Sequence, residues 1–350
     1  DWFYDVGFDE AAGNAQTDNL GRGGEAGDVL RAEALDHSGR NNANMSTPSD
    51  GESPRMQMFL WDGFEETAVE AAGASYDVGV ARFGPTDFDV TAPTTVVDDG
   101  VGTGSDGCES LTADLSGRIA VIDRGGCSFL IKVRNAEAAG ALAVIVVNDR
   151  GTGTTNMSTS TGGTTGIGAL MVSQADGAGL RGGATARVHR AVGPDAASSL
   201  DSQVVTHEWG HYLHRRLVDF GSVQGRAESE GWGDFLSVMM GLRPGDDLRG
   251  AFPTASYSNH GDEPVYYGTR RVPYSVDRAF DALSFRHISD GEALPDTHPV
   301  GPGPSDNSEV HNAGEIWATM MFDALVALLE RSREAGAPYD FDGGLRRMAG

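Results

Sequence analysis

Residues 207–211 constrain the fold of this chain more than any other segment. They read His207-Glu208-Trp209-Gly210-His211, with two histidines four positions apart and a glutamate after the first. On a helix such histidines lie on one face and reach one metal ion, and the glutamate lies beside that ion. The alternative is a chance match on an ordinary helix. Because a glycine inside a helix costs up to about 1 kcal/mol relative to alanine, neighbouring elements must hold this helix in place.

A third ligand is expected from the next helix. A catalytic zinc site needs three protein ligands and one open position. Glu230 follows His211 by 19 residues, which fits a helix, a turn and an antiparallel helix. Asp234 lies four residues further on the same face, where it can hydrogen-bond the far nitrogen of a ligand histidine, His207 in particular. The alternative for Glu230 is an acidic residue favoured by the helix dipole at a helix start.

The chain divides into three regions of different composition. Residues 1–70 are aromatic at both ends and polar between, with a strand predicted at 55–61. Residues 71–195 are rich in Gly, Thr, Val and Asp and contain a predicted strand, helix and strand at 118–123, 129–139 and 142–147, followed by a strand at 167–172. This order predicts a βαβ unit with parallel strands. Residues 196–350 are mostly helical, with the clearest helices at 200–218, 228–242 and 310–333.

Composition and charge narrow the function classes. The formal net charge of −25 argues against nucleic acid and anionic membrane surfaces as partners. The 39% hydrophobic content suffices for a sizeable core in one large or two smaller domains. The longest apolar run, residues 141–147, is much shorter than the roughly 20 residues of a membrane span. The chain starts without Met and stops after a predicted helix, so we expect a processed chain or a fragment.

Several motifs together resemble the fungalysin family of zinc peptidases, a branch of the thermolysin-like group. The resemblance rests on the His207–His211 motif followed by Glu230-Gly231-Trp232-Gly233-Asp234, and it covers nearly all of residues 1–61 and 196–350. The further matching segments are Asn41-Asn42-Ala43-Asn44, Asp50-Gly51, Arg55-Met56-Gln57-Met58, Asp306-Asn307-Ser308-Glu309-Val310-His311 and Gly314-Glu315-Ile316-Trp317. The resemblance implies an α+β fold with a two-lobed, thermolysin-like catalytic domain and a cleft between the lobes.

The resemblance also implies roles for individual residues. It makes His207, His211 and Glu230 the ligands of one zinc ion and Glu208 the general base. It makes His311 the residue that stabilises the oxyanion, and Asp306 the carboxylate that orients His311. Weaker matches are Asn42 and Ala43 as substrate-backbone contacts and Arg271 as an arginine facing the S1′ side. This chain departs from the family pattern at two points, so the resemblance does not predict the shape of the substrate pocket. Tyr212 stands where fungal members usually have Gly, and the spacing from His211 to Glu230 is shorter than in those members.

The middle region resembles a protease-associated domain inserted at residues 71–195, just before the metal-binding helix. The matching segments are residues 115–122, Arg124-Gly125-Gly126-Cys127-Ser128-Phe129, Lys132-Val133 and residues 136–141. Such domains accompany secreted peptidases and carry no catalytic residues. The remaining regions are then the N-terminal lobe, 1–70, and the helical zinc-binding lobe, 196–350, which the resemblance implies is incomplete at its C-terminus. The alternative is a neutral insertion in a surface loop.

These features predict a secreted zinc endopeptidase with polypeptide substrates, and an inhibitory propeptide outside this chain is a further candidate partner. In that setting Cys108 and Cys127 are expected to form a disulfide, although two buried thiols are the alternative. The Asp-rich stretches could bind calcium, but no twelve-residue calcium loop supports this. The rival interpretations are a zinc aminopeptidase and a non-catalytic extracellular binding protein. Zinc aminopeptidases usually bind two metals through a different ligand set, so the His207–His211 motif argues against the first interpretation. The intact Glu208 and Glu230 argue against a non-catalytic binding protein.

Overall fold

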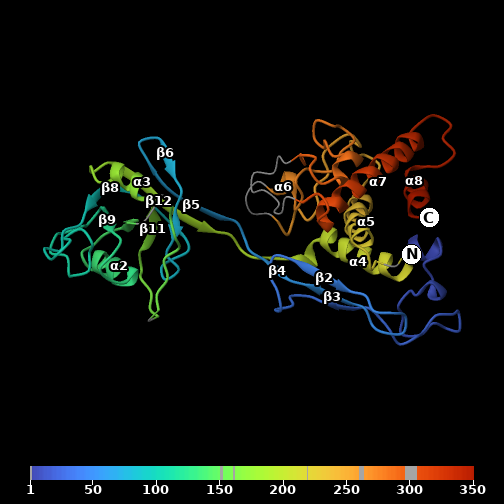
Figure 1. Ribbon diagram of the computed structural model, residues 1–350, viewed down its shortest axis with the longest axis horizontal. Helices are drawn as coiled ribbons and strands as arrows, with labels where there is room; N and C mark the ends of the chain where they lie inside the picture. Colours follow the sequence, from blue (N-terminus) through green and yellow to red (C-terminus); the bar gives the residue numbers. More distant parts are fainter. Residues whose placement is uncertain (1, 150–152, 161, 219, 260–263, 296–305) are drawn as a thin grey trace. The chain divides into compact units, whose positions relative to one another are not determined.

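The computed structural model describes residues 2–149, 153–160, 162–218, 220–259, 264–295 and 306–350 (Figure 1). The mixed α/β chain forms two compact units: unit 1 is Asp1–Gly63 with Pro194–Gly350, and unit 2 is Phe64–Gly193. These limits lie a few residues before the 70/71 and 195/196 boundaries expected from composition. The reason is that residues 65–71 pair with residues 186–192 along their whole length, in the sheet of unit 2.

Unit 2 is built around one sheet, which has eight strands among the described residues, in the order β6-β5-β12-β8-β9-β10-β11-β7. Strands β8 to β11 run parallel, as the βαβ pattern predicted, while β12 is antiparallel to β5 and β8. The elements are β5 (Glu65–Ala71), β6 (Ala74–Tyr76), β7 (Gly79–Val80), β8 (Phe88–Val96), β9 (Ile119–Asp123), α2 (Phe129–Ala138), β10 (Ala143–Val147), β11 (Gly168–Val172), α3 (Gln174–Leu180) and β12 (Thr185–Val192).

Both faces of this sheet are buried, which explains the continuous apolar runs of its central strands. In β9, Ala120 and Ile122 pack in one core with residues of α2. Ile119 and Val121 point to the opposite core, which includes Leu180 at the end of α3. Helices α2 and α3 therefore cover opposite faces of the sheet.

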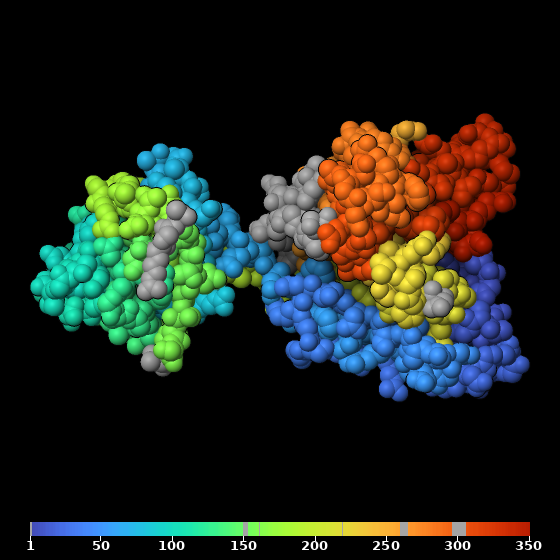
Figure 2. All heavy atoms as spheres, viewed as in Figure 1, coloured from blue at the N-terminus to red at the C-terminus, as the bar shows by residue number. Residues whose placement is uncertain are grey.

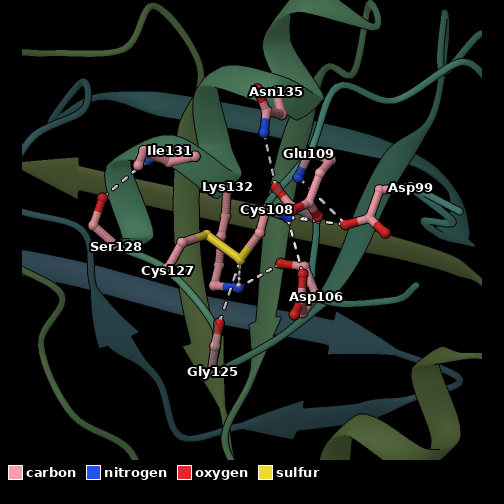
Figure 3. The surroundings of a disulfide bond; sticks show 11 residues. Asp99, Asp106, Cys108, Glu109, Gly125, Cys127, Ser128, Ile131, Lys132 and Asn135 are labelled. Atoms are coloured by element: carbon pink, nitrogen blue, oxygen red, sulfur yellow. Dashed lines mark hydrogen bonds between the residues drawn. A yellow bond between two sulfur atoms is a disulfide. The ribbon is translucent and has the colours of Figure 1, made fainter. Parts of the chain in front are cut away.

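A disulfide between Cys108 and Cys127 joins the loop after β8 to the start of α2 (Figure 3). The buried Lys132 reaches the same place from α2, where its Nζ donates to the Asp106 carbonyl and lies 3.3 Å from Cys108 Sγ. Asn135, one turn further, donates to the Gly107 carbonyl at 3.0 Å. The disulfide and these two side chains together fix a long loop that has no regular secondary structure of its own.

Unit 1 begins with two small sheets. The first has the order β1-β3-β2, with β1 (Arg31–Glu33) parallel and β2 (Ala43–Ser46) antiparallel to β3 (Arg55–Met58). The strand predicted at 55–61 breaks at Phe59, whose carbonyl instead accepts hydrogen bonds from the backbone and side chain of Ser198. Beyond the break, β4 (Leu60–Trp61) pairs with β13 (Ala196–Ala197).

Three long helices form the body of unit 1: α4 (Ser202–Leu217), α5 (Val223–Gly241) and α7 (Val310–Ser332). Their N-termini are capped by the side chains of Asp201, Ser222 and Glu309, which satisfy backbone N–H groups of the first turn. Helix α5 starts five residues before the predicted position because Ser222 provides this cap. The remaining helical segments are α1 (Trp2–Asp5), η1 (Glu10–Ala12), η2 (Ser198–Leu200), α6 (Pro264–Tyr267), η3 (Phe285–Ile288) and α8 (Phe341–Ala349).

The first and last segments of the described chain lie side by side in unit 1 (Figure 2). Arg346 of α8 stacks over the Trp2 ring and lies 3.4 Å from a carboxylate oxygen of Asp5. The main core lies between the helices and the first small sheet, and it includes Met56, Phe235 and Phe322. None of the described helices combines the length and the apolar character required to cross a membrane.

We predict that replacing both cysteines by serine lowers the free energy of unfolding of unit 2 by about 3 kcal/mol, because the bond closes a loop of 19 residues. Denaturant unfolding of the oxidised wild type and the double variant measures this difference. Wild type in reductant is the control and should match the variant. Equal stability of oxidised and reduced wild type would contradict the prediction.

Candidate metal centre

Helix α4 presents both motif histidines on one face, beside Glu208. The ring centroids of His207 and His211 lie 4.7 Å apart. One ligand atom from each ring and one carboxylate oxygen of Glu230 all lie within 4.8 Å of one another, a spacing compatible with a shared metal ion. The structure thus brings together the three side chains that the motif analysis singled out, and Glu208 is buried next to them.

Glu230 lies in the third turn of α5 rather than at its start, because the helix begins at Val223. The dipole of a helix start therefore does not explain a carboxylate at this position. Its Oε1 lies 3.5 Å from His211 Nε2 and its Oε2 lies 3.4 Å from His207 Nε2. Oε2 is buried and makes no hydrogen bond. A buried carboxylate oxygen without a donor is costly unless a cation meets it.

Glycines allow the helices to approach closely enough for this arrangement. A Cβ atom at Gly210 of α4 would lie 2.9 Å from Gly233 Cα of α5, and one at Gly233 would lie 2.6 Å from His207 Nδ1. On the other side of α5, a Cβ atom at Gly314 of α7 would lie 2.7 Å from Glu230 Cβ. The packing of α4 and α7 against α5 thus holds Gly210 inside its helix despite its low helix propensity.

The far nitrogens of both imidazoles have hydrogen-bond partners on α5. His207 Nδ1 lies 2.8 Å from Asp234 Oδ1, the partner expected from the sequence. Asp234 also accepts from Arg270 and from the Tyr274 hydroxyl, each at 2.5 Å. His211 Nδ1 lies 2.8 Å from the hydroxyl of Ser229. With Nδ1 engaged on each ring, both Nε2 atoms face Glu230.

The electrostatics of the two imidazoles differ sharply. Burial acts to lower the pKa of His207, but Asp234 and Glu230 outweigh it and raise that pKa to about 10. Burial lowers the pKa of His211 to about 3. For Glu230, burial acts to raise the pKa, yet the two histidines hold it well below its ordinary value. Burial also raises the pKa of the Glu208 carboxyl to about 7, which suits a group that takes and returns a proton near neutral pH.

His311 lies in the first turn of α7 and faces this centre, with its Nε2 atom 3.5 Å from Glu230 Oε2. The carboxylate on its other nitrogen is Glu309, at 2.8 Å, and not Asp306 as the family resemblance implied. Glu309 also accepts from the backbone N–H groups of His311 and Asn312, so it is the helix cap as well. Asp306 acts through its backbone, whose carbonyl accepts from the Asn312 side chain at 2.8 Å.

Ala43 is the first residue of β2, an edge strand of the small sheet, and Asn42 directly precedes it. The Asn42 side chain is exposed, and its Oδ1 accepts from the Ala43 backbone at 2.9 Å. Arg215 of α4 donates to the Met45 carbonyl at 2.7 Å, so β2 is bound to the helix that carries the histidines. Contact of these residues with a substrate stays a prediction.

Arg271 is buried rather than open to solvent. Its Nε donates to Glu315 Oε2 at 2.6 Å, and another of its nitrogens donates to Asn312. Both partners lie on α7, so the arginine holds the start of the helix that carries His311. Its predicted position on the S1′ side is not tested by these contacts.

Sequence reasoning missed several residues of the site. Ser229 directly precedes Glu230, and Arg270 directly precedes Arg271, but neither belongs to a motif. His214, three residues after His211 on the same helix, is 4% exposed, and neither of its ring nitrogens makes a hydrogen bond in the structure.

Two imidazoles and a buried glutamate on one helix, completed by a carboxylate from the next, define a metallopeptidase site of the H-E-x-x-H type. A family model described as fungalysin metallopeptidase (M36) matches residues 1–342, and the chain belongs to this family.

Individual relatives match over shorter segments. The extracellular metalloproteinase mep of Aspergillus flavus is 51% identical over 61 residues, which cover 17% of this chain and 10% of that protein. Extracellular metalloproteinase 4 of Arthroderma otae is 41% identical over 80 residues, 23% of this chain and 12% of that protein. The chain thus matches about a tenth of the length of these curated relatives.

A solved zinc aminopeptidase from Bacillus subtilis aligns with a TM-score of 0.32 and 24% identity, over 43% of this chain and 33% of that one. A similarity this low carries no argument about fold or activity.

We predict that Gly233→Ala weakens zinc binding at least about tenfold, because the new methyl group must displace the His207 ring and with it the bond to Asp234. Gly241→Ala, in the same helix, is the matched control, since its Cβ would meet nothing within 4 Å. Chelator competition measures the affinity, and the control should keep the wild-type value. Equal affinity of both variants would show that the close approach does not matter for the ligand.

Proposed function

We propose that this chain is the catalytic part of a secreted zinc endopeptidase that hydrolyses peptide bonds within proteins. The observation that carries the proposal is the group of His207, His211 and Glu230, whose ligand atoms lie within 4.8 Å of one another beside the buried Glu208. Membership of a metallopeptidase family supports proteolysis, and the relatives named extracellular metalloproteinases support secretion.

The residues present fit a zinc ion. Two imidazole nitrogens and one carboxylate oxygen are a typical donor set for catalytic zinc, which keeps a fourth position open. The unpaired Oε2 of Glu230 supplies a buried oxygen that no described donor satisfies. Zinc held by these three side chains supplies a Lewis acid that polarises the scissile carbonyl and lowers the pKa of water to about 7.

The protein's own groups then handle the protons and the developing charge. Glu208, with its pKa near 7, accepts a proton from the attacking water and delivers it to the leaving amine. His311, held by Glu309 and with its Nε2 atom 3.5 Å from Glu230 Oε2, donates a hydrogen bond to the oxyanion. Asp234 keeps His207 in the tautomer that presents Nε2.

The finer architecture is part of the same proposal. Unit 1 corresponds to a thermolysin-like catalytic domain in which the small sheets form one lobe and the three long helices the other. Unit 2 corresponds to a protease-associated domain. Its parallel β9-α2-β10 arrangement and the disulfide at the start of α2 support this assignment. The aminopeptidase alternative lacks support, because in the described part of unit 1 the metal-capable side chains form a single group.

The test of this function combines two substitutions. Glu208→Gln preserves size and hydrogen bonding but cannot accept the proton, so zinc should stay bound while casein hydrolysis falls at least about 100-fold. Glu230→Ala should instead lose most of the zinc. An aminopeptidase substrate serves as the control for the rival activity. Near-normal hydrolysis by Glu208→Gln, or cleavage restricted to free N-termini, would overturn the proposal.

We also predict which carboxylate orients His311. Glu309→Gln should lower kcat by roughly tenfold with little change in KM, because the ring loses its charged partner while the amide can still accept at the helix start. Asp306→Asn is the matched control and should leave kcat near the wild-type value, since Asp306 contributes its backbone. The reverse ranking of the two variants would restore the role that the family resemblance gave to Asp306.

A further inference from the structure

The two ligand imidazoles have chemically different partners. His207 is backed by Asp234, a carboxylate that also binds Arg270 and Tyr274. His211 is backed by the neutral hydroxyl of Ser229, at 2.8 Å. Ser229 is 1% exposed and directly precedes Glu230, so one turn of α5 supplies both a ligand and the partner of another ligand.

The geometry fixes what this hydroxyl can do. An imidazole whose Nε2 faces a cation must carry its proton on Nδ1, and Ser229 Oγ is placed to accept it. The Nε2 atom of His211 then points at Glu230 Oε1, 3.5 Å away. A neutral acceptor also suits the local charge, because Glu230 and Asp234 contact the imidazoles and Glu208 is buried beside them. A further carboxylate would add repulsion without a cationic partner of its own.

We propose that Ser229 is a positioning residue for the metal centre, which holds His211 in the Nδ1-protonated tautomer and aims its Nε2 at the ion. This inference rests on the zinc site of the proposed function. The alternative is a merely structural role, in which the hydroxyl satisfies a buried ring nitrogen and contributes only to the stability of the helix pair.

The experiment measures zinc affinity by competition with a chromogenic chelator. Ser229→Ala should weaken zinc binding by roughly 10- to 100-fold, as the loss of an outer partner of a ligand histidine typically does. Ser229→Thr keeps the hydroxyl and should recover most of the affinity. Ser237→Ala is the matched control: this buried serine lies on the same helix, but its hydroxyl donates to the Asp234 carbonyl rather than to a ligand ring.

A second measurement covers the case in which Ser229→Ala does not fold. Nitrogen-15 NMR of the zinc-loaded wild type should show His211 with a protonated Nδ1 that exchanges slowly with solvent. A protonated Nε2, or equal zinc affinity of wild type and Ser229→Ala, would overturn the inference. An equal loss of affinity in the Ser229→Ala and Ser237→Ala variants would likewise assign Ser229 a structural role. If wild type binds no zinc at all, the proposed function fails instead.

Discussion

Backbone contact between α5 and its two neighbours is the constraint on which the site depends. Side chains on two helices can share one ion only if the helix axes approach closely, and an ordinary Cβ at the crossing prevents this. Gly210 and Gly233 remove that obstacle between α4 and α5, and Gly314 removes it between α5 and α7. The carboxylate of Glu230 thereby comes within reach of both histidines and of the first turn of α7.

The approach of α7 depends in addition on buried polar pairs. Arg271 binds Glu315 and Asn312, and Asn312 in turn donates to the Asp306 carbonyl just before the helix. Breaking a buried ion pair by removing one partner costs about 3–5 kcal/mol, because a charge is left without compensation. These contacts therefore help to fix the start of α7, which carries His311.

The sequence was sufficient where a motif and its helical period act together. Two histidines four apart, with a glutamate on the following helix, predicted that His207, His211 and Glu230 come together, and the strand-helix-strand order predicted the parallel core of unit 2. The sequence was insufficient where the path of a loop or the rotation of a helix determines which side chains meet. Glu309 rather than Asp306 meets His311 because it is the residue whose side chain turns back as the cap. Ser229 meets His211 because α5 begins early enough to place residue 229 inside a regular helix.

The charge distribution explains why the site suits a cation. His207 and His211 lie one turn apart on the same helix, and His207 is half-buried while His211 is buried. Their pKa values nevertheless shift in opposite directions. The difference comes from the carboxylates: Asp234 and Glu230 both contact His207, whereas His211 has the neutral Ser229 as its closer partner. The site thus concentrates negative charge around the space between the Nε2 atoms. A divalent cation bound there would meet the same carboxylates that raise the pKa of His207. Since a ligand histidine binds as the neutral ring, such an ion would take the place of the proton.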